Sequence, residues 1–558
     1  MQKRMNCPAA IVLLLCALVL NGCATPIGVQ KVSPQEAYRS AYANPLNEGV
    51  ASDQAKHVLN RYYLLEKFKD DPAAAIADLH EKALRDDRRD ILYALAEASY
   101  LYGGQLANKS LPENRALAPD YFLLSALYAY YFFLEVRSEP VPTAFDRRAR
   151  NAVDLYNFGL WHAFATGEGG ALELEGKTRK LPFGRLSISL DTSKLHWAME
   201  DFEKFEPANQ YEIRGVAVRN RTPGVGLPLI GIKKKSLDSF SAVPVTAFLR
   251  IQGNLASLSA GTAAANLELH STVDSRTLLF DNRVLPLETD YTAPLAYKLE
   301  GSEMWDFGAS VFLGRVKNKI LDGLYLHEPY RPGKIPVVFV HGTASSPIWW
   351  TEMFNTLRFD PLIRERFQFW YFLYTSSQPI VVSAADLRDA LHEKLEKLDP
   401  EKKDAALRQM VVIGHSQGGL LTKLTAVETG DSLVRAMTEE GIDSMKTPEE
   451  VKTKLRRVLM IRPLPFVREV IFLSTPHRGS FLSKGWIRDL VRAIVRLPIT
   501  LVESTLVYYD YMNPEMRKLL GGKRSAFTSV DGMSPDNPLL KALAEIPLAP
   551  GVRGHSII

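Results

Sequence analysis

From residue 335 onward, short runs that are apolar almost throughout alternate with amphipathic helical patterns. The runs are IPVVFVHG, RFQFWYFLY, QMVVIGHS and VREVIFLS, and patterns such as SAADLRDALHEKLEKLD separate them. A strand without a polar face is covered on both sides, which is typical of a parallel sheet flanked by helices. The sequence therefore predicts an α/β domain, which we place at residues 315–558.

One of these runs leads into the stretch GHSQGG, residues 414–419, and the helical pattern LLTKLTAV follows it. A serine on a sharp strand-to-helix turn needs small residues two positions before and after it, because side chains there would collide with the adjacent strand and helix. Gly414 and Gly418 meet this need. Such a turn presents the hydroxyl of Ser416 above the sheet, at the N-terminus of the next helix. Ser416 is therefore the predicted nucleophile.

Two further motifs accompany this turn. VVFVHG, residues 337–342, precedes TASSP upstream, and STPHRG, residues 474–479, follows a later strand. With GHSQGG they resemble the α/β-hydrolase superfamily, specifically its lipase-like members with a His-Gly oxyanion loop and the GPI inositol-deacylase-like hydrolases. The resemblance covers about residues 335–558.

The resemblance also implies roles for individual residues. The backbone amides of Thr343 and Gln417 would stabilise the oxyanion, and His341 and Gly342 would shape the oxyanion loop. Imidazoles at the position of His341 usually pack, and His477 in STPHRG is expected to be structural.

The catalytic acid and base are harder to place. In this fold the chain order is serine, then acid, then a histidine after the last strand. By the resemblance, the tail GVRGHSII looks like the start of the seventh strand. Either the chain is truncated, so that the acid and the histidine lie beyond Ile558, or the triad uses residues that are present. In the second case His555 is the predicted base, paired with Asp531 or Asp536.

The first 23 residues have the composition of an export signal. Lys3 and Arg4 precede Ala9–Leu20, an apolar run too short to cross a bilayer as a permanent helix. The following residues, LNGC, resemble the bacterial lipobox, in which the cysteine is acylated and becomes the mature N-terminus. An ordinary secretory peptide is the alternative.

Cysteine usage agrees with the lipobox. Cys7, Cys16 and Cys23 are the only cysteines, so the mature chain would keep Cys23 alone and form no internal disulfide. The resemblance implies lipidation of Cys23 and a protein tethered to the cell envelope by acyl chains. Ala24 favours the outer membrane over the inner membrane.

A chain of 558 residues is too long for a single ordinary core, and two more regions precede the α/β domain. Residues 33–166 have apolar residues at spacings of three and four, which predicts an all-helical array. Residues 167–314 contain short alternating runs, namely GRLSISLD, YEIRGVAV, VPVTAFLRI, ANLELHSTV and RTLLFDN, which predict a β-rich domain. NRTPGVGLPLIG is expected to be a structured loop.

Composition narrows the possible functions. The formal charge of +5 is small for this length and its lysines and arginines are spread along the chain, so no nucleic-acid partner is expected. The histidines show no HExxH or paired spacing, and we expect neither a metal nor a cofactor.

The sequence thus predicts an envelope-anchored serine hydrolase that cleaves a small-molecule or lipid ester through an acyl-enzyme on Ser416. The membrane would be a partner through the lipid anchor. The alternative is a non-catalytic or degenerate hydrolase-like scaffold that binds a protein partner through its helical array.

Overall fold

The computed structural model describes residues 27–143, 145–166, 170–234, 242–273, 275–300, 322–345, 347–479, 509, 511–520 and 529–558. The predicted signal and Cys23 lie outside these residues. The described chain forms two compact units. The first comprises the chain up to Gly159 together with Lys180–Gly184 and Asn254–Ser259, and the second comprises the remainder.

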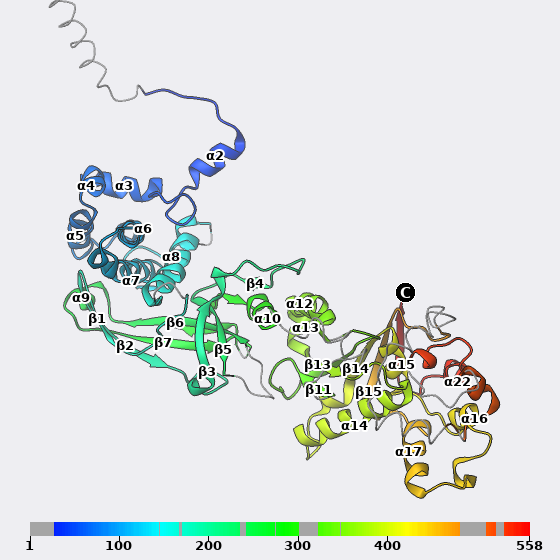
Figure 1. Cartoon of the computed structure of the whole chain (residues 1–558). Helices are drawn as coiled ribbons and strands as arrows, with labels where there is room; N and C mark the ends of the chain where they lie inside the picture. Colours follow the sequence, from blue (N-terminus) through cyan, green and yellow to red (C-terminus); the bar gives the residue numbers. More distant parts are fainter. Residues whose placement is uncertain are drawn as a thin grey trace, which may run out of the picture. The chain divides into compact units, whose positions relative to one another are not determined.

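The first unit is built from helices. They are α2 (Pro34–Ala41), α3 (Asp53–Arg61), α4 (Leu65–Asp70), α5 (Pro72–Ala83), α6 (Arg89–Ala107), α7 (Pro112–Leu134) and the part of α8 (Arg147–Phe164) up to Gly159. α6 and α7 pack along each other (Figure 1). α7 is long and apolar enough to cross a membrane, but 83% of its most apolar window is buried, so it serves as the core helix of this unit.

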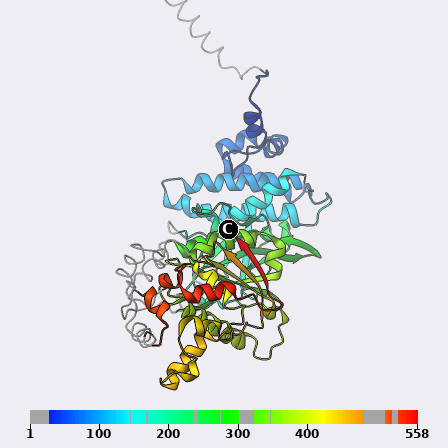
Figure 2. The ribbon, with the colours of Figure 1, turned by 90° about the vertical axis from the view of Figure 1, so that its right-hand side faces the viewer.

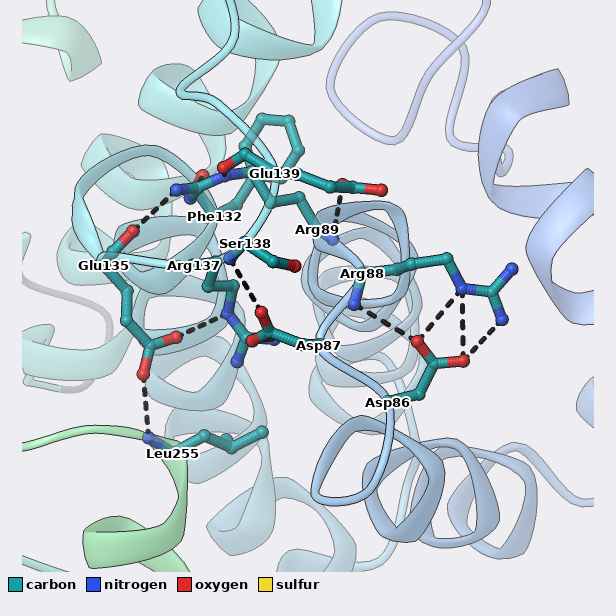
Figure 3. Close-up of polar contacts among 10 residues, drawn as sticks. All are labelled: Asp86, Asp87, Arg88, Arg89, Phe132, Glu135, Arg137, Ser138, Glu139 and Leu255. Carbon is teal, nitrogen blue, oxygen red and sulfur yellow. Dashed lines mark hydrogen bonds and ion pairs between the residues drawn. The ribbon is translucent and has the colours of Figure 1, made fainter.

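A buried arginine fixes the end of α7. The guanidinium of Arg89, at the start of α6, donates to the carbonyl oxygens of Phe132 at 2.7 Å, Glu135 at 2.8 Å and Glu139 at 3.0 Å (Figure 3). Helices end with carbonyl groups that have no partner within the helix, and a cation is favourable there. Arg89 is only 3% exposed, so these carbonyls replace the water that its guanidinium loses.

A six-stranded sheet has the order β1-β2-β7-β6-β5-β3 and belongs to the second unit, except for the last two residues of β1 and the first residue of β2. The strands are β1 (Thr178–Leu181), β2 (Gly184–Asp191), β3 (Phe202–Pro207), β5 (Leu227–Lys233), β6 (Ala242–Gln252) and β7 (Ala263–Ser271). β6 pairs antiparallel with both β5 and β7, whereas β2 and β7 are parallel.

Two expectations for this sheet were wrong. Residues 211–218, the alternating run YEIRGVAV, contain no strand. Residues 227–231, the end of the predicted loop NRTPGVGLPLIG, lie in β5 between β3 and β6, and every residue of β5 is buried. A strand covered on both faces shows no polar alternation, so its one proline and one glycine suggested a loop.

The second sheet of this unit has the order β11-β13-β12-β14-β15-β16. Its strands are β11 (Gly323–Leu326), β12 (Ile335–Val340), β13 (Phe367–Leu373), β14 (Met410–His415), β15 (Val467–Leu473) and β16 (Arg553–Ile557). All neighbours are parallel except β11, which runs antiparallel to β13 at one edge. β16, red in Figure 2, forms the other edge.

Helices pack on both faces of this sheet, as Figure 1 shows. One face is covered by α14 (Ile380–Leu398), α15 (Gln417–Lys423), α17 (Glu449–Leu459), α20 (Pro514–Leu519) and α22 (Pro538–Glu545). The other face packs against α10 (Thr292–Leu299), η4 (Pro347–Trp350) and α12 (Thr351–Phe359). The predicted α/β class, with a parallel sheet between helices, is confirmed.

Candidate active site

Ser416 occupies a strained turn between β14 and α15. Its backbone has φ 52° and ψ −122°, in the region that residues with a side chain rarely adopt. The turn is held on both sides, because the Ser416 amide donates to Leu473 O at 2.9 Å and its carbonyl accepts from Gly419 N at 3.0 Å. Ser416 is partly exposed. Strain of this kind persists only where the surrounding structure imposes it, and such strain clusters at functional sites.

The glycines around Ser416 lie where backbones come close. A Cβ at Gly414 would be 2.4 Å from the carbonyl oxygen of Gly418, and one at Gly418 would be 2.3 Å from the carbonyl oxygen of Val340. A Cβ at Gly419 would be 1.8 Å from Thr475 Oγ1. The strand and the helix can therefore approach this closely only because these positions lack side chains.

The loop after β12 lies directly beside this turn. A Cβ on Gly342 would lie 3.1 Å from Ser416 Cβ. The hydroxyl of Thr343 donates to Gln417 Oε1 at 2.6 Å. The structure thus brings the two predicted oxyanion residues, Thr343 and Gln417, together beside Ser416. Gln417 is the first residue of α15, and the first amides of a helix have no partner within it.

His341 is part of the scaffold of this loop. Its ring is 2% exposed and stacks on Tyr374 with ring centroids 4.3 Å apart. The Tyr374 amide donates to Nε2 at 3.4 Å, so Nδ1 carries the proton and donates to Gly342 O at 3.0 Å. Burial lowers the pKa of His341 to about 4. Both ring nitrogens are occupied, and His341 therefore has no free nitrogen with which to act as a base.

Two other histidines, His415 and His477, are candidates for a base that could act on Ser416. His477 packs edge-on against Phe472, with ring centroids 4.6 Å apart, and burial lowers its pKa. His415 is exposed, and its ring lies 6.4 Å from that of Trp350. Among the described residues, none forms a hydrogen bond with the hydroxyl of Ser416.

His555 lies on β16, at some distance from Ser416. Its Nε2 contacts Glu469 Oε2 at 2.9 Å, so the carboxylate beside it is Glu469 and neither of the two predicted aspartates. His555 is in register with Ile471, whereas His415 is in register with Leu473. Ser416 therefore lies three residues further along the strand direction, about 10 Å at 3.3 Å per residue. His555 is also on the second strand from β14.

Within the described ranges, no group of three or more His, Cys, Asp or Glu side chains could hold a metal ion. The chemistry that these residues offer is a hydroxyl on a strained turn beside backbone amides. That combination suits nucleophilic attack on a carbonyl carbon.

One protein-family model matches part of the chain. The chlorophyllase family model matches residues 314–473. None of the curated proteins matches the chain.

Two solved structures are similar over part of the chain. The Bacillus licheniformis lipase BlEst2 in its mature form is 18% identical, with a TM-score of 0.19, over 31% of this chain and 60% of that one. The Thermogutta terrifontis esterase Est2 is 14% identical, with a TM-score of 0.17, over 31% of this chain and 56% of that one. The chain thus spans less than two thirds of the length of either enzyme.

The sheet order, the turn at Ser416 and the chlorophyllase match lead to one assignment. The chain contains a domain with the α/β-hydrolase fold.

Proposed function

We propose that this domain cleaves a carboxylic ester by acyl transfer to Ser416. The hydroxyl oxygen attacks the carbonyl carbon, the alcohol leaves with a proton, and water then releases the acid from the acyl-enzyme. The amides of Thr343 and Gln417 would stabilise the negative oxygen of each tetrahedral intermediate. The observation that carries the proposal is the positive φ of Ser416 at the end of β14, beside the loop of Gly342.

The reaction also needs a base within about 3 Å of the Ser416 hydroxyl in the reacting complex. His341 is unsuited, because both of its ring nitrogens are engaged in hydrogen bonds. His555 is paired with Glu469 on another strand. We assign no base among the described residues.

The proposed substrate is a lipid or acyl ester at the cell envelope. The lipobox-like LNGC supports an anchor at Cys23, which would hold the domain at a membrane. The outer membrane is the proposed location. The chlorophyllase match supports an ester as the reacting group.

The test is the turnover of p-nitrophenyl esters, from acetate to palmitate, by the purified protein. We expect turnover that Ser416→Ala abolishes without changing the far-ultraviolet circular dichroism spectrum. Turnover that survives Ser416→Ala would refute the nucleophile. Absence of turnover in the unsubstituted protein would instead favour the degenerate scaffold, with the helical unit as its protein-binding part.

A further inference from the structure

A closed polar network ties the loop after β12 to the turn at Ser416. The hydroxyl of Thr343 donates to Gln417 Oε1 at 2.6 Å, and Gln417 Nε2 donates to Ser376 O at 3.2 Å. The hydroxyl of Ser376 in turn accepts from the amide of Ala344 at 3.1 Å. Three segments that are distant in sequence therefore meet in one ring of hydrogen bonds.

Two members of the network are shielded from water, whereas Thr343 is partly exposed and Ala344 is exposed. Gln417 is 0% exposed and Ser376 is 1% exposed. A hydrogen bond lost in such a place leaves a buried polar group without a partner, which is unfavourable. Gln417 and Ser376 are therefore expected to hold their geometry firmly.

Ala344, one member of this network, has an unusual backbone conformation. Its φ is 52°, a left-handed backbone that is strained for a residue with a side chain. The amide of Ala344 donates to Ser376 Oγ, and this bond holds the peptide plane between Thr343 and Ala344. That plane directly follows Thr343, so its orientation limits where Thr343 and the amide of Thr343 can lie.

We propose that Ser376 is a positioning residue for the oxyanion hole. It holds Ala344 in its strained conformation through its hydroxyl and orients the side chain of Gln417 through its carbonyl. Ser376 does not touch the substrate. The inference rests on the proposed function, because it assigns the amide of Thr343 to the oxyanion.

The neighbouring residue provides a matched control. Ser377 is also 1% exposed, but its carbonyl makes the contact, accepting from Ser529 N at 3.2 Å. Ser377→Ala also removes a serine hydroxyl from this loop, but it leaves the ring of hydrogen bonds intact.

The experiment measures kcat and KM for a p-nitrophenyl ester, with melting temperatures, in Ser376→Ala, Ser376→Cys and Ser377→Ala. Direct removal of an oxyanion donor costs about 100- to 1,000-fold in kcat. For Ser376→Ala we expect a loss of about 10- to 100-fold in kcat with KM within about twofold, because the donor is misplaced and not deleted. Ser376→Cys, which keeps a weak acceptor, should be intermediate, and Ser377→Ala should match the unsubstituted protein.

A second variant, Ala344→Gly, keeps the inference testable if Ser376→Ala is unstable. Glycine adopts a positive φ without strain, so Ala344→Gly should reduce the kcat loss caused by Ser376→Ala. Equal losses in both backgrounds, an unchanged kcat in Ser376→Ala, or an equal loss in Ser377→Ala would overturn the positioning role. If turnover depends on Ser416 in all these cases, the proposed function still stands. If the unsubstituted protein has no turnover, the proposed function fails, and this inference fails with it.

Discussion

At the scale of single residues, Gly418, two positions after Ser416, offers a direct test of the close packing at the turn. A methyl group on Gly418 would lie 2.3 Å from Val340 O and 2.4 Å from His341 O, and both atoms belong to backbones that are held in place. We expect Gly418→Ala to lower the free energy of unfolding by about 3 kcal/mol. Gly441→Ala is the control, because Gly441 has φ −62° and no heavy atom within 4 Å of its Cβ position. Its effect should stay within about 0.5 kcal/mol in denaturant unfolding, and equal effects of the two substitutions would contradict the close packing.

His341 predicts a pH dependence of stability. Its pKa is lowered by burial from 6.5 to about 4, so below pH 6.5 the unfolded chain binds a proton that the folded chain does not. Stability from this residue is complete above pH 6.5 and is lost as the pH falls through about 4, with a total near 3 kcal/mol. Melting temperatures from pH 7 to pH 4 should therefore fall more steeply for the unsubstituted protein than for His341→Gln. Parallel curves would show that His341 is not buried in its neutral form.

Some residues of the candidate site could be predicted from the sequence, and others could not. Ser416, Gly414 and Gly418 form a local pattern, and a local turn geometry explains their spacing. Ser376 has no such signal. Its partners lie 32 residues before it and 41 residues after it in the chain, and only the folded sheet brings them together.

At the scale of elements, the contact between α6 and α7 depends on Arg89. Replacing it with methionine keeps an unbranched side chain but leaves the carbonyls of Phe132, Glu135 and Glu139 without this donor. We expect Arg89→Met to destabilise the helical unit by about 2–4 kcal/mol. Hydrogen exchange of α7 amides, read by mass spectrometry, should show the loss. Arg85→Met is the control, because the Arg85 side chain is 81% exposed, and equal protection in both variants would refute the role of Arg89.

Elements with one dominant pattern were predictable from the sequence. The apolar runs that became β12 to β15 were predicted because a buried parallel strand has no polar face. The prediction of a strand at residues 211–218 was wrong, because an alternating pattern does not by itself provide a neighbouring strand to pair with. β5 was missed for the opposite reason, since its proline and glycine suggested a loop while both of its neighbours in the sheet are strands.

At the scale of the whole molecule, the proposed anchor at Cys23 gives a prediction that does not depend on catalysis. Metabolic labelling with a palmitate analogue should mark the protein in bacterial cells, because an acylated cysteine carries fatty acids into the membrane. Cys23→Ala should remove the label and release the protein from the membrane fraction. A label that persists in Cys23→Ala would refute the lipobox assignment.

The central claim is that Ser416 is a reactive nucleophile, and covalent labelling with a fluorophosphonate tests it most directly. The intact mass of the purified protein should increase by one phosphonate group, and peptide mapping should locate that group on Ser416. Ser416→Ala should remain unmodified under the same conditions, with His555→Ala labelled like the unsubstituted protein. An unmodified wild-type chain, or a phosphonate on any other residue with Ser416 free, would contradict the account.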